Sequence, residues 1–410
     1  MATSLPDLNQ LARSVGEADR AAQQDPQQRE PLLELLLEFC QALLAQHEFA
    51  DAGTASAEAM RVAGDLIEEG RPEFAVQLGI AMRYHADALL ELGESERALD
   101  VYGSAIRLLG ELAQGNPSVG PEWAGTLLNH GEALRRCGRA EQALAVLDQA
   151  LTSFELASGR ALTQLARGRT LAELGRAEQA LAATREAVEL ARELDDASLA
   201  DALDALATLL RSLGRADEAI ELAEQATELV ARLAQRDAIR YLLPLARLTN
   251  NLARAYQQAR QFDRATALFE QAVSGFRILA QARPHAHGLT LIQVMSNHSL
   301  ALAQTGALER AHAVASEALE LAQRESGWEL LPLITGARQF LADLALDLGR
   351  PEEALGHLVA GMRLLRAAIE QQLPGTTEAA TRLGASLREL CATQRLAIPE
   401  DVAAMLSSSA

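Results

Sequence analysis

Apolar and polar residues along this chain alternate with a helical period that tight turns interrupt at regular intervals. The predicted turn centres lie 37 to 46 residues apart. They are His47, Gly93, Gly138, Gly175, Gly214, Arg260, Gly306 and Gly349. Repetition at this period predicts helical hairpins that stack along the chain, because one hairpin alone cannot bury its apolar face.

Small residues stand at fixed distances from every turn centre. Alanine stands five residues after each one: Ala52, Ala98, Ala143, Ala180, Ala219, Ala265, Ala311 and Ala354. Seven residues before stand Cys40, Ala86, Gly131, Gly168, Ala207, Ala253, Ser299 and Ala342. Twelve residues after stand Ala59, Ala105, Ala150, Ala187, Ala226, Ala272, Ala318 and Gly361. Two antiparallel helices approach closely only where facing side chains are small, so these positions predict the helix crossings.

Composition favours one helical class of protein and argues against several functions. Only 3% of the 410 residues are aromatic, which suits a stack rich in Ala and Leu and argues against a β architecture. A net charge of −19 argues against sequence-blind binding of nucleic acid. The basic residues are all arginine, so chemistry that depends on lysine is excluded.

The termini and the cysteines predict a cytoplasmic protein. The N-terminus has no basic start and no apolar run before Pro6, and no apolar stretch is long enough to cross a membrane. The three cysteines lie far apart, and Cys40 occupies a helix crossing, where we expect a buried and unreactive residue. We therefore expect a reducing compartment and no contact with a membrane.

Helix-breaking residues suggest how the chain is divided. Breakers between hairpins are expected at 115–121, Pro244, Pro284 and 327–332. Residues 1–30 are predicted to form a lead-in helix or a flexible arm, and residues 31–373 the repeat stack. Within residues 374–410 we expect one capping helix, over 377–395, followed by a frayed tail from Pro399.

The repeated pattern resembles the tetratricopeptide repeat. The resemblance covers roughly residues 31–373, and its clearest stretch reads Asn-Asn-Leu-Ala-Arg-Ala-Tyr at 250–256, followed by Gln-Phe-Asp-Arg-Ala at 261–265. This stretch is similar to the longer repeats of kinesin-light-chain type, which also occur in bacterial proteins. The resemblance implies an all-α fold, a right-handed α-solenoid of about eight helical hairpins with a C-terminal capping helix.

The resemblance also implies a binding face, because first helices of such repeats line a concave surface that commonly holds an extended peptide. Residues at the corresponding positions, together with arginines on the same face, are Arg83, Tyr84, Asn129, Glu132, Arg135, Arg169, Arg247, Asn250, Asn251, Arg254, Ser296 and Asn297. Asparagine recurs nine residues before the turn, and its amide can pair with any peptide backbone. Alternatively, these asparagines crosslink neighbouring helices, and the arginines pair only with acids of their own stack.

Candidate chemistry is otherwise absent from the sequence. His85, His130 and His298 share one register but belong to separate hairpins, so we expect packed, hydrogen-bonded histidines and no metal site. The pair His285 and His287 lacks nearby cysteines or acids. No phosphate-binding, dinucleotide-binding or hydrolase motif occurs, and we expect no catalytic residue and no cofactor.

The sequence therefore predicts a non-enzymatic interaction module, an adaptor or scaffold that binds a segment of another protein. Because residues 1–100 hold 19 acids and 7 bases while the middle of the chain is nearly neutral, we expect the segment to be extended and partly acidic. Two alternatives stay open: a regulatory sensor that responds to a peptide, and a helical accessory subunit that docks rigidly on an enzyme or effector. Homo-oligomerisation also stays open.

Overall fold

The computed structural model describes residues 7–325, 327–373 and 375–408. The described residues contain α-helices and short 3-10 helices and no strand, so the predicted all-α fold class is confirmed. The chain divides into two units, residues 1–215 and 216–410, which we describe separately. The boundary falls just after the predicted turn at Gly214. The three predicted domain bounds stay a prediction, and residue 374, at the start of the predicted cap, lies outside the described residues.

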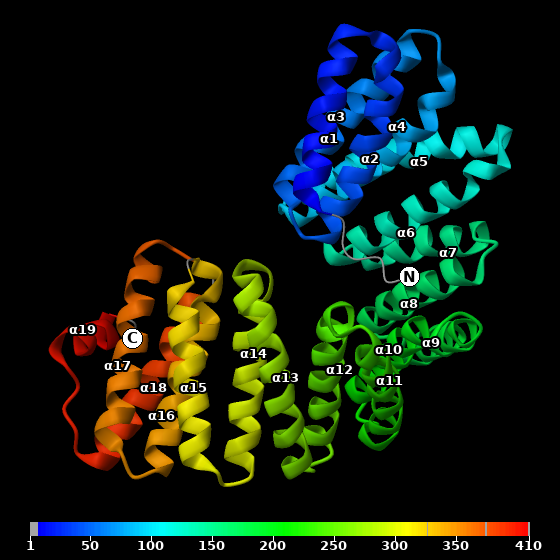
Figure 1. The fold of residues 1–410 in the computed structure, drawn as a ribbon. Helices are drawn as coiled ribbons and strands as arrows, with labels where there is room; N and C mark the ends of the chain where they lie inside the picture. The colour runs from blue at the N-terminus through cyan, green and yellow to red at the C-terminus, as the bar shows by residue number, and fades with distance from the viewer. Residues whose placement is uncertain (1–6, 326, 374, 409–410) are drawn as a thin grey trace. The chain divides into compact units, whose positions relative to one another are not determined.

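Unit 1 is a run of helices joined by short turns (Figure 1). Its α-helices are α1 (Leu8–Gln24), α2 (Arg29–Ala45), α3 (Phe49–Glu68), α4 (Ala75–Glu91), α5 (Ser95–Gly115), α6 (Gly120–Arg136), α7 (Ala140–Ser153), α8 (Ala157–Glu173), α9 (Ala177–Arg192) and α10 (Asp196–Ser212). The 3-10 helices η1 (Pro26–Gln28), η2 (Pro72–Phe74) and η3 (Pro117–Val119) lead into α2, α4 and α6. Each begins with proline, whose fixed φ suits a first helical position and whose missing N–H costs nothing there.

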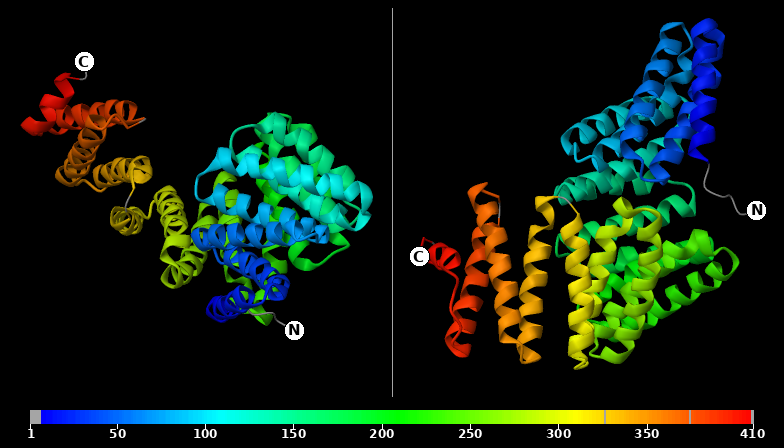
Figure 2. Two further views of the ribbon diagram at one scale, coloured as in Figure 1. Left: turned by 90° about the horizontal axis from the view of Figure 1, so that it is seen from above. Right: turned by 60° about the vertical axis from the view of Figure 1, so that its left-hand side comes forward.

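Unit 2 continues the same architecture, and α13 to α17 stand side by side as antiparallel rods in both sets of views (Figures 1 and 2). Its α-helices are α11 (Ala216–Arg236), α12 (Ala238–Gln258), α13 (Phe262–Ala282), α14 (Pro284–Gln304), α15 (Leu308–Arg324), α16 (Leu331–Asp347), α17 (Pro351–Glu370), α18 (Thr376–Gln394) and α19 (Glu400–Ser408). The 3-10 helix η4 (Trp328–Leu330) leads into α16.

Every predicted turn centre lies between two helices and adopts the left-handed backbone conformation. The values of φ run from 72° to 83° at the six glycines and are 62° at His47 and 59° at Arg260. Glycine is favoured there because a Cβ makes this conformation costly, by roughly 1–2 kcal/mol. His47 and Arg260 therefore hold a strained conformation that the surrounding hairpins impose.

The predicted helix crossings are confirmed. All eight alanines that follow the turns are 0% exposed, and the residues at the two other small positions are all buried. A Cβ added at Gly131 would lie 2.7 Å from Leu147, and one added at Gly168 would lie 2.4 Å from the Thr184 hydroxyl. Facing helices therefore touch at these positions, and no larger residue fits without movement.

Two expectations about chain breaks were wrong. Pro244 lies inside α12, which continues through it, although proline removes one backbone hydrogen bond of the helix. The expected frayed tail after Pro399 instead forms α19. Val402 (0% exposed) and Leu406 (9% exposed) of α19 pack with Leu383 and Leu387 of α18, which continues the core to the last described turn.

Candidate functional site

The first helices of successive hairpins contact one another and form one layer within unit 1. α2 contacts α4, α4 contacts α6, and α6 contacts α8. The predicted site residues of this unit lie on α4 (Arg83 and Tyr84), α6 (Asn129, Glu132 and Arg135) and α8 (Arg169). We call the exposed side of these three helices the α4–α6–α8 face.

A half-buried carboxylate joins α4 to α6 at this face. Asp87 Oδ1 accepts a hydrogen bond from Asn129 Nδ2 at 3.1 Å and another from the Tyr102 hydroxyl. The His130 ring stacks on Tyr102, with 5.7 Å between ring centroids. Burial raises the pKa of Asp87, although both hydrogen bonds and the nearby Arg83 act in the opposite direction. The Asn129 amide thus crosslinks two helices, as the alternative interpretation of the asparagines predicts.

Arg83 is held at the edge of the face. Its Nη2 lies 3.0 Å from Glu122 Oε2, and its guanidinium lies 5.0 Å from the centre of the Tyr84 ring. The side chain is only 19% exposed, and its Nε is buried without a hydrogen-bond partner. A buried donor without a partner is costly, so this Nε–H favours an acceptor supplied from outside.

The remaining arginines of the face are paired with acids. Arg135 donates to Glu132 at 2.6 Å and also pairs with Glu173, while Arg169 Nη2 lies 3.6 Å from Glu132. Burial would raise the pKa of Glu132, but the Arg135 hydrogen bond and the charges of Arg169 and Arg135 outweigh it, so this pKa is lowered. The field that was expected to attract an acidic segment is therefore largely neutralised within the stack.

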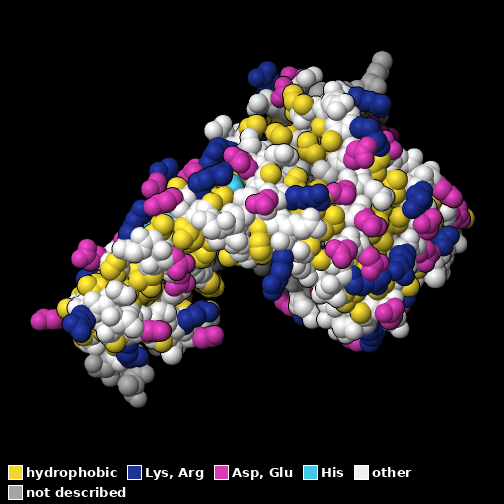
Figure 3. Space-filling view, turned by 90° about the horizontal axis from the view of Figure 1, so that it is seen from below, with side chains coloured by type: hydrophobic (Ala, Val, Ile, Leu, Met, Phe, Trp, Pro, Cys, Tyr) yellow, Lys and Arg dark blue, Asp and Glu magenta, His cyan; other side chains and the backbone are white. Residues whose placement is uncertain are grey.

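Pairing of this kind is visible on the surface. On the side of the molecule in Figure 3, arginine and acidic side chains are interspersed instead of gathered by sign. No long-range attraction for one sign of charge is expected from such a surface, because alternating charges cancel within a Debye length.

Two hollows open on the α4–α6–α8 face and share Asn129. The first has a volume of ≈ 520 Å³. We call it the α6–α8 hollow, and Arg83, Leu128 and Asn129 line it. The second shared hollow, of ≈ 330 Å³, is lined by residues that include Asn129, Glu132 and Asp87. A third hollow, of ≈ 690 Å³, lies elsewhere in unit 1, at Arg61 and Arg97.

Two exposed leucines border the α6–α8 hollow. Leu156, in the link between α7 and α8, is 66% exposed, and Leu162 of α8 is 56% exposed. Gly125 and Gly159 line the hollow and have no side chains that would fill it. A Cβ at Gly159 would lie 2.2 Å from the Phe154 ring. The hollow therefore offers apolar surface next to a guanidinium and an amide, the combination typical of a small binding site.

The predicted residues of unit 2 lie on two first helices, α12 and α14, which contact each other. Arg247, Asn250 and Asn251 of α12 are half-buried, whereas Arg254 is exposed. The Asn250 Oδ1 is buried without a hydrogen-bond partner. On α14, Ser296 and Asn297 are half-buried.

The Ser296 hydroxyl donates to the Ile292 carbonyl within its own helix, at 2.9 Å. This bond satisfies the hydroxyl locally, so Ser296 has less to offer a ligand than its position on the face predicts.

The three histidines at the shared register are packed, as expected, but their hydrogen bonding differs. His85 Nδ1 lies 3.0 Å from the Ser56 hydroxyl. His130 Nδ1 and His298 Nε2 are buried without hydrogen-bond partners, and burial lowers the pKa of both residues. The expected hydrogen bond is therefore seen for His85, and one ring nitrogen each of His130 and His298 lacks it.

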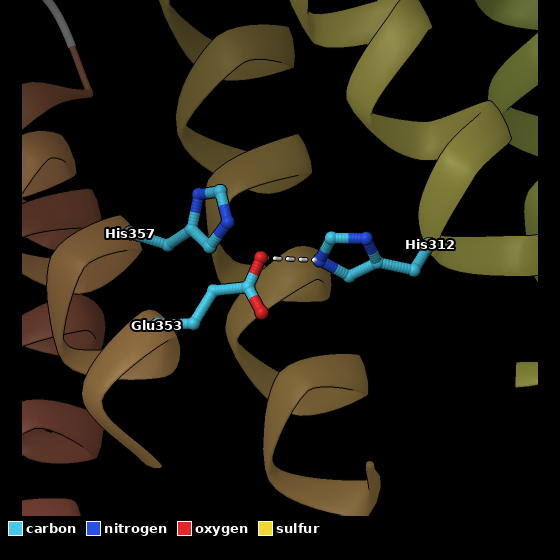
Figure 4. A group of neighbouring side chains, drawn as sticks. All are labelled: His312, Glu353 and His357. Atoms are coloured by element: carbon cyan, nitrogen blue, oxygen red, sulfur yellow. Dashed lines mark ion pairs between the residues drawn. The ribbon is translucent and has the colours of Figure 1, made fainter. Parts of the chain in front are cut away.

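A histidine and glutamate cluster in unit 2 escaped the sequence analysis. His312 of α15, with Glu353 and His357 of α17, brings three potential metal-ligand atoms within 4.8 Å of one another. Their side chains point toward a common centre (Figure 4). The available signal was the i, i+4 spacing of Glu353 and His357, which places both on one helix face. His312 lies too far away in sequence for any spacing rule to include it.

The fold defines a class of protein, the helical-hairpin repeat proteins. Residues 159–232 and residues 245–282 match family models of the tetratricopeptide repeat. These two segments therefore carry tetratricopeptide repeats, as the sequence pattern predicts. Among curated proteins no sequence matches this chain.

Solved structures show the same fold. The apo form of RapI is 13% identical, with a TM-score of 0.56, and the match covers 90% of this chain and 100% of RapI. A signal transduction ATPase with numerous domains from Pyrococcus horikoshii, which carries a tetratricopeptide repeat sensor, is 18% identical with a TM-score of 0.51. That match covers 83% of this chain and 54% of the ATPase. No helix of the described residues is both long and apolar enough to cross a membrane.

Proposed function

We propose that this protein is a non-enzymatic adaptor or scaffold that binds a segment of a partner protein on the α4–α6–α8 face. The observation that carries the proposal is the α6–α8 hollow, where exposed Leu156 and Leu162 stand beside Arg83 and Asn129. Exposed leucines next to polar groups at a concavity favour a ligand with an apolar anchor and a polar backbone.

The chemistry of the hollow suggests how a segment binds. A leucine-sized or aromatic side chain fits the apolar border, and each such side chain contributes about 1.5–3 kcal/mol when it is fully buried. The Arg83 guanidinium lines the hollow and is a donor for a backbone carbonyl or a carboxylate, which supports a partly acidic segment. The asparagines that recur nine residues before the turn contribute to the proposal only in part, because the Asn129 Nδ2 already donates to Asp87.

The predicted residues of α12 extend the proposal to unit 2. Buried Asn250 Oδ1 and exposed Arg254 support a second contact region on α12. The three cysteines are free thiols, which supports the proposed cytoplasmic location, where disulfides are rare. A sensor role, as in the archaeal ATPase with a repeat sensor, is the alternative that a fold neighbour favours.

A peptide-display selection tests the proposal. Short random peptides are selected on the full chain and their dissociation constants measured against two variants. The double substitution Leu156→Asp and Leu162→Asp is expected to weaken binding by at least about tenfold, since it places charges in the apolar border. The matched control is Ile239→Asp, which changes a residue that is 91% exposed in unit 2. Peptides that bind all three proteins equally would place the site elsewhere.

A further inference from the structure

The cluster of His312, Glu353 and His357 lies on second helices of unit 2, apart from the proposed peptide site. α15 carries His312, and α17 carries Glu353 and His357 one helical turn apart. Figure 4 shows His312 reaching in from one side and the other two residues from the opposite side. From this convergence we propose that the three side chains bind one divalent transition-metal ion of the zinc class.

The distances suit such an ion. His312 Nε2 lies 3.1 Å from Glu353 Oε1, and the two imidazole ring centroids are 6.2 Å apart. Ligand atoms around a tetrahedral zinc ion, at bond lengths of about 2.0–2.1 Å, stand roughly 3.4 Å from one another. The His312–Glu353 spacing already fits this value. Because all three donors lie within 4.8 Å of one another, small side-chain rotations complete the site.

The contact between His312 and Glu353 is not a satisfied hydrogen bond. Although the two atoms are close, His312 Nε2 is buried and has no hydrogen-bond partner of acceptable direction. The His312 side chain is only 14% exposed, so water reaches it poorly. A cation bound between the His312 nitrogen and the Glu353 carboxylate would satisfy both groups.

Neighbouring charges shape the site in two ways. The positive charge of Arg338 acts on His357. Arg350 Nη1 lies 3.6 Å from Glu353 Oε2, so that Oε1 is left toward His312. Both arginines also repel a dication, and Glu353 supplies the only negative charge among the three ligands.

Two histidines and one carboxylate form a ligand set that zinc accepts, with the fourth position open to water or to a group from outside. The ion would join α15 to α17, the second helices of successive hairpins, and so resist their separation. Binding to the folded chain alone must raise its melting temperature.

Cobalt(II) is a suitable probe, because its visible absorption reports tetrahedral coordination. The full chain, stripped with a chelator and dialysed, is titrated with Co²⁺, and Zn²⁺ is then added as competitor. We expect one Co²⁺ per chain, displaced by Zn²⁺, and a melting temperature that rises with either ion. His312→Gln and His357→Gln are each expected to weaken binding by at least about tenfold. Their melting temperatures in chelator, equal to that of the wild type, would show that both variants fold.

The matched control is the double substitution His285→Gln and His287→Gln, which removes the other close histidine pair of unit 2. Full Co²⁺ binding by this control, with loss in the two ligand variants, supports the site. Absence of tetrahedral Co²⁺ absorption in the wild type would overturn the proposal. So would binding that persists in both ligand variants or disappears in the control, since the ion would then be bound elsewhere.

Discussion

Two polar clusters between neighbouring helices differ in how their donors and acceptors match. Around Asp87, one carboxylate oxygen receives hydrogen bonds from Tyr102 and Asn129. Around His312, Nε2 forms no hydrogen bond, although potential ligand atoms of Glu353 and His357 lie within 4.8 Å. Closeness alone therefore does not separate a structural crosslink from a binding site; the match between donors and acceptors does.

The difference has consequences for function. The matched Asp87 cluster fixes α4 against α6 and so holds the hollows of the α4–α6–α8 face in shape. The unmatched His312 cluster contributes little to stability on its own, and a cation would change that. Substitutions at the two clusters should therefore have opposite signatures: large effects on folding at the first, and large effects on metal binding at the second.

Loss of the matched carboxylate should produce the largest effect. Asp87→Ala leaves the Tyr102 hydroxyl and the Asn129 amide without their shared acceptor, and we expect it to lower the free energy of unfolding by about 2–4 kcal/mol. Urea denaturation measures this change. Glu353→Gln is the corresponding substitution at the other cluster. In chelator it should lower the free energy of unfolding by less than about 1 kcal/mol. Equal costs at both positions would remove the distinction between the clusters.

The helix crossing between α8 and α9 should be nearly as sensitive. Gly168→Ala adds a Cβ 2.4 Å from the buried Thr184 hydroxyl, so we expect a loss of about 1–3 kcal/mol. Gly64→Ala is the control, because a Cβ there meets nothing within 4 Å. In α3 this substitution should stabilise the protein by up to about 1 kcal/mol, since alanine favours helix. Thermal unfolding of both variants measures these changes in stability. An unchanged stability in Gly168→Ala would mean that the crossing is loosely packed.

The pH dependence of unfolding should distinguish Glu132 from Asp87. Because the pKa of Glu132 is lowered in the fold, Glu132 stabilises the protein above its ordinary pKa of 4.5, and this stability is lost as the pH falls through the lowered value. The raised pKa of Asp87 has the opposite sign, since ionisation above 3.8 opposes folding.

Glu132→Gln should therefore cost about 1 kcal/mol near neutral pH and almost nothing at a pH well below 4.5. Urea denaturation of wild type and variant at both pH values measures the difference. A cost that is independent of pH would show that the Arg135 and Arg169 pairs do not hold Glu132 ionised.

The smallest predicted effect sharpens the account of the unmatched cluster. Arg338 opposes a cation at His357, and its own pKa is lowered by burial. Arg338→Met should tighten Co²⁺ binding by about two- to tenfold, because it removes that repulsion. Arg382→Met, at an exposed arginine of α18, serves as the control and should leave the affinity unchanged. Weaker binding in Arg338→Met would mean that Arg338 organises the ligands.

The repeated features of the fold could be predicted from sequence because packing constrains them in the same way in every hairpin. Ala52 and Ala354 occupy equivalent crossings although 302 positions separate them, and both are 0% exposed. Turn positions could also be placed at His47 and Arg260, where glycine is missing, because the surrounding repeat fixes them. Pro244 could not be judged correctly, since flanking packing allows α12 to continue through it.

The candidate sites could be predicted only in part. The register identifies Asn129 as a residue of the first-helix face, but not that Asp87, from the preceding hairpin, takes its amide hydrogen bond. Likewise, no local pattern connects His312 to His357, because their meeting depends on the rotation between successive hairpins. Single exposed leucines such as Leu156 carry no sequence signal at all; they matter only beside a hollow.

Photocrosslinking tests the central claim, that the α6–α8 hollow binds a partner segment, most directly. Leu162 is replaced by p-benzoylphenylalanine in one protein and the control residue Ile239 in another, and each is irradiated with a peptide selected on the wild type. The account predicts that the peptide is attached at position 162, that unlabelled peptide prevents this attachment, and that position 239 stays unmodified. Attachment at 239 alone, or equal attachment at both positions, would contradict it.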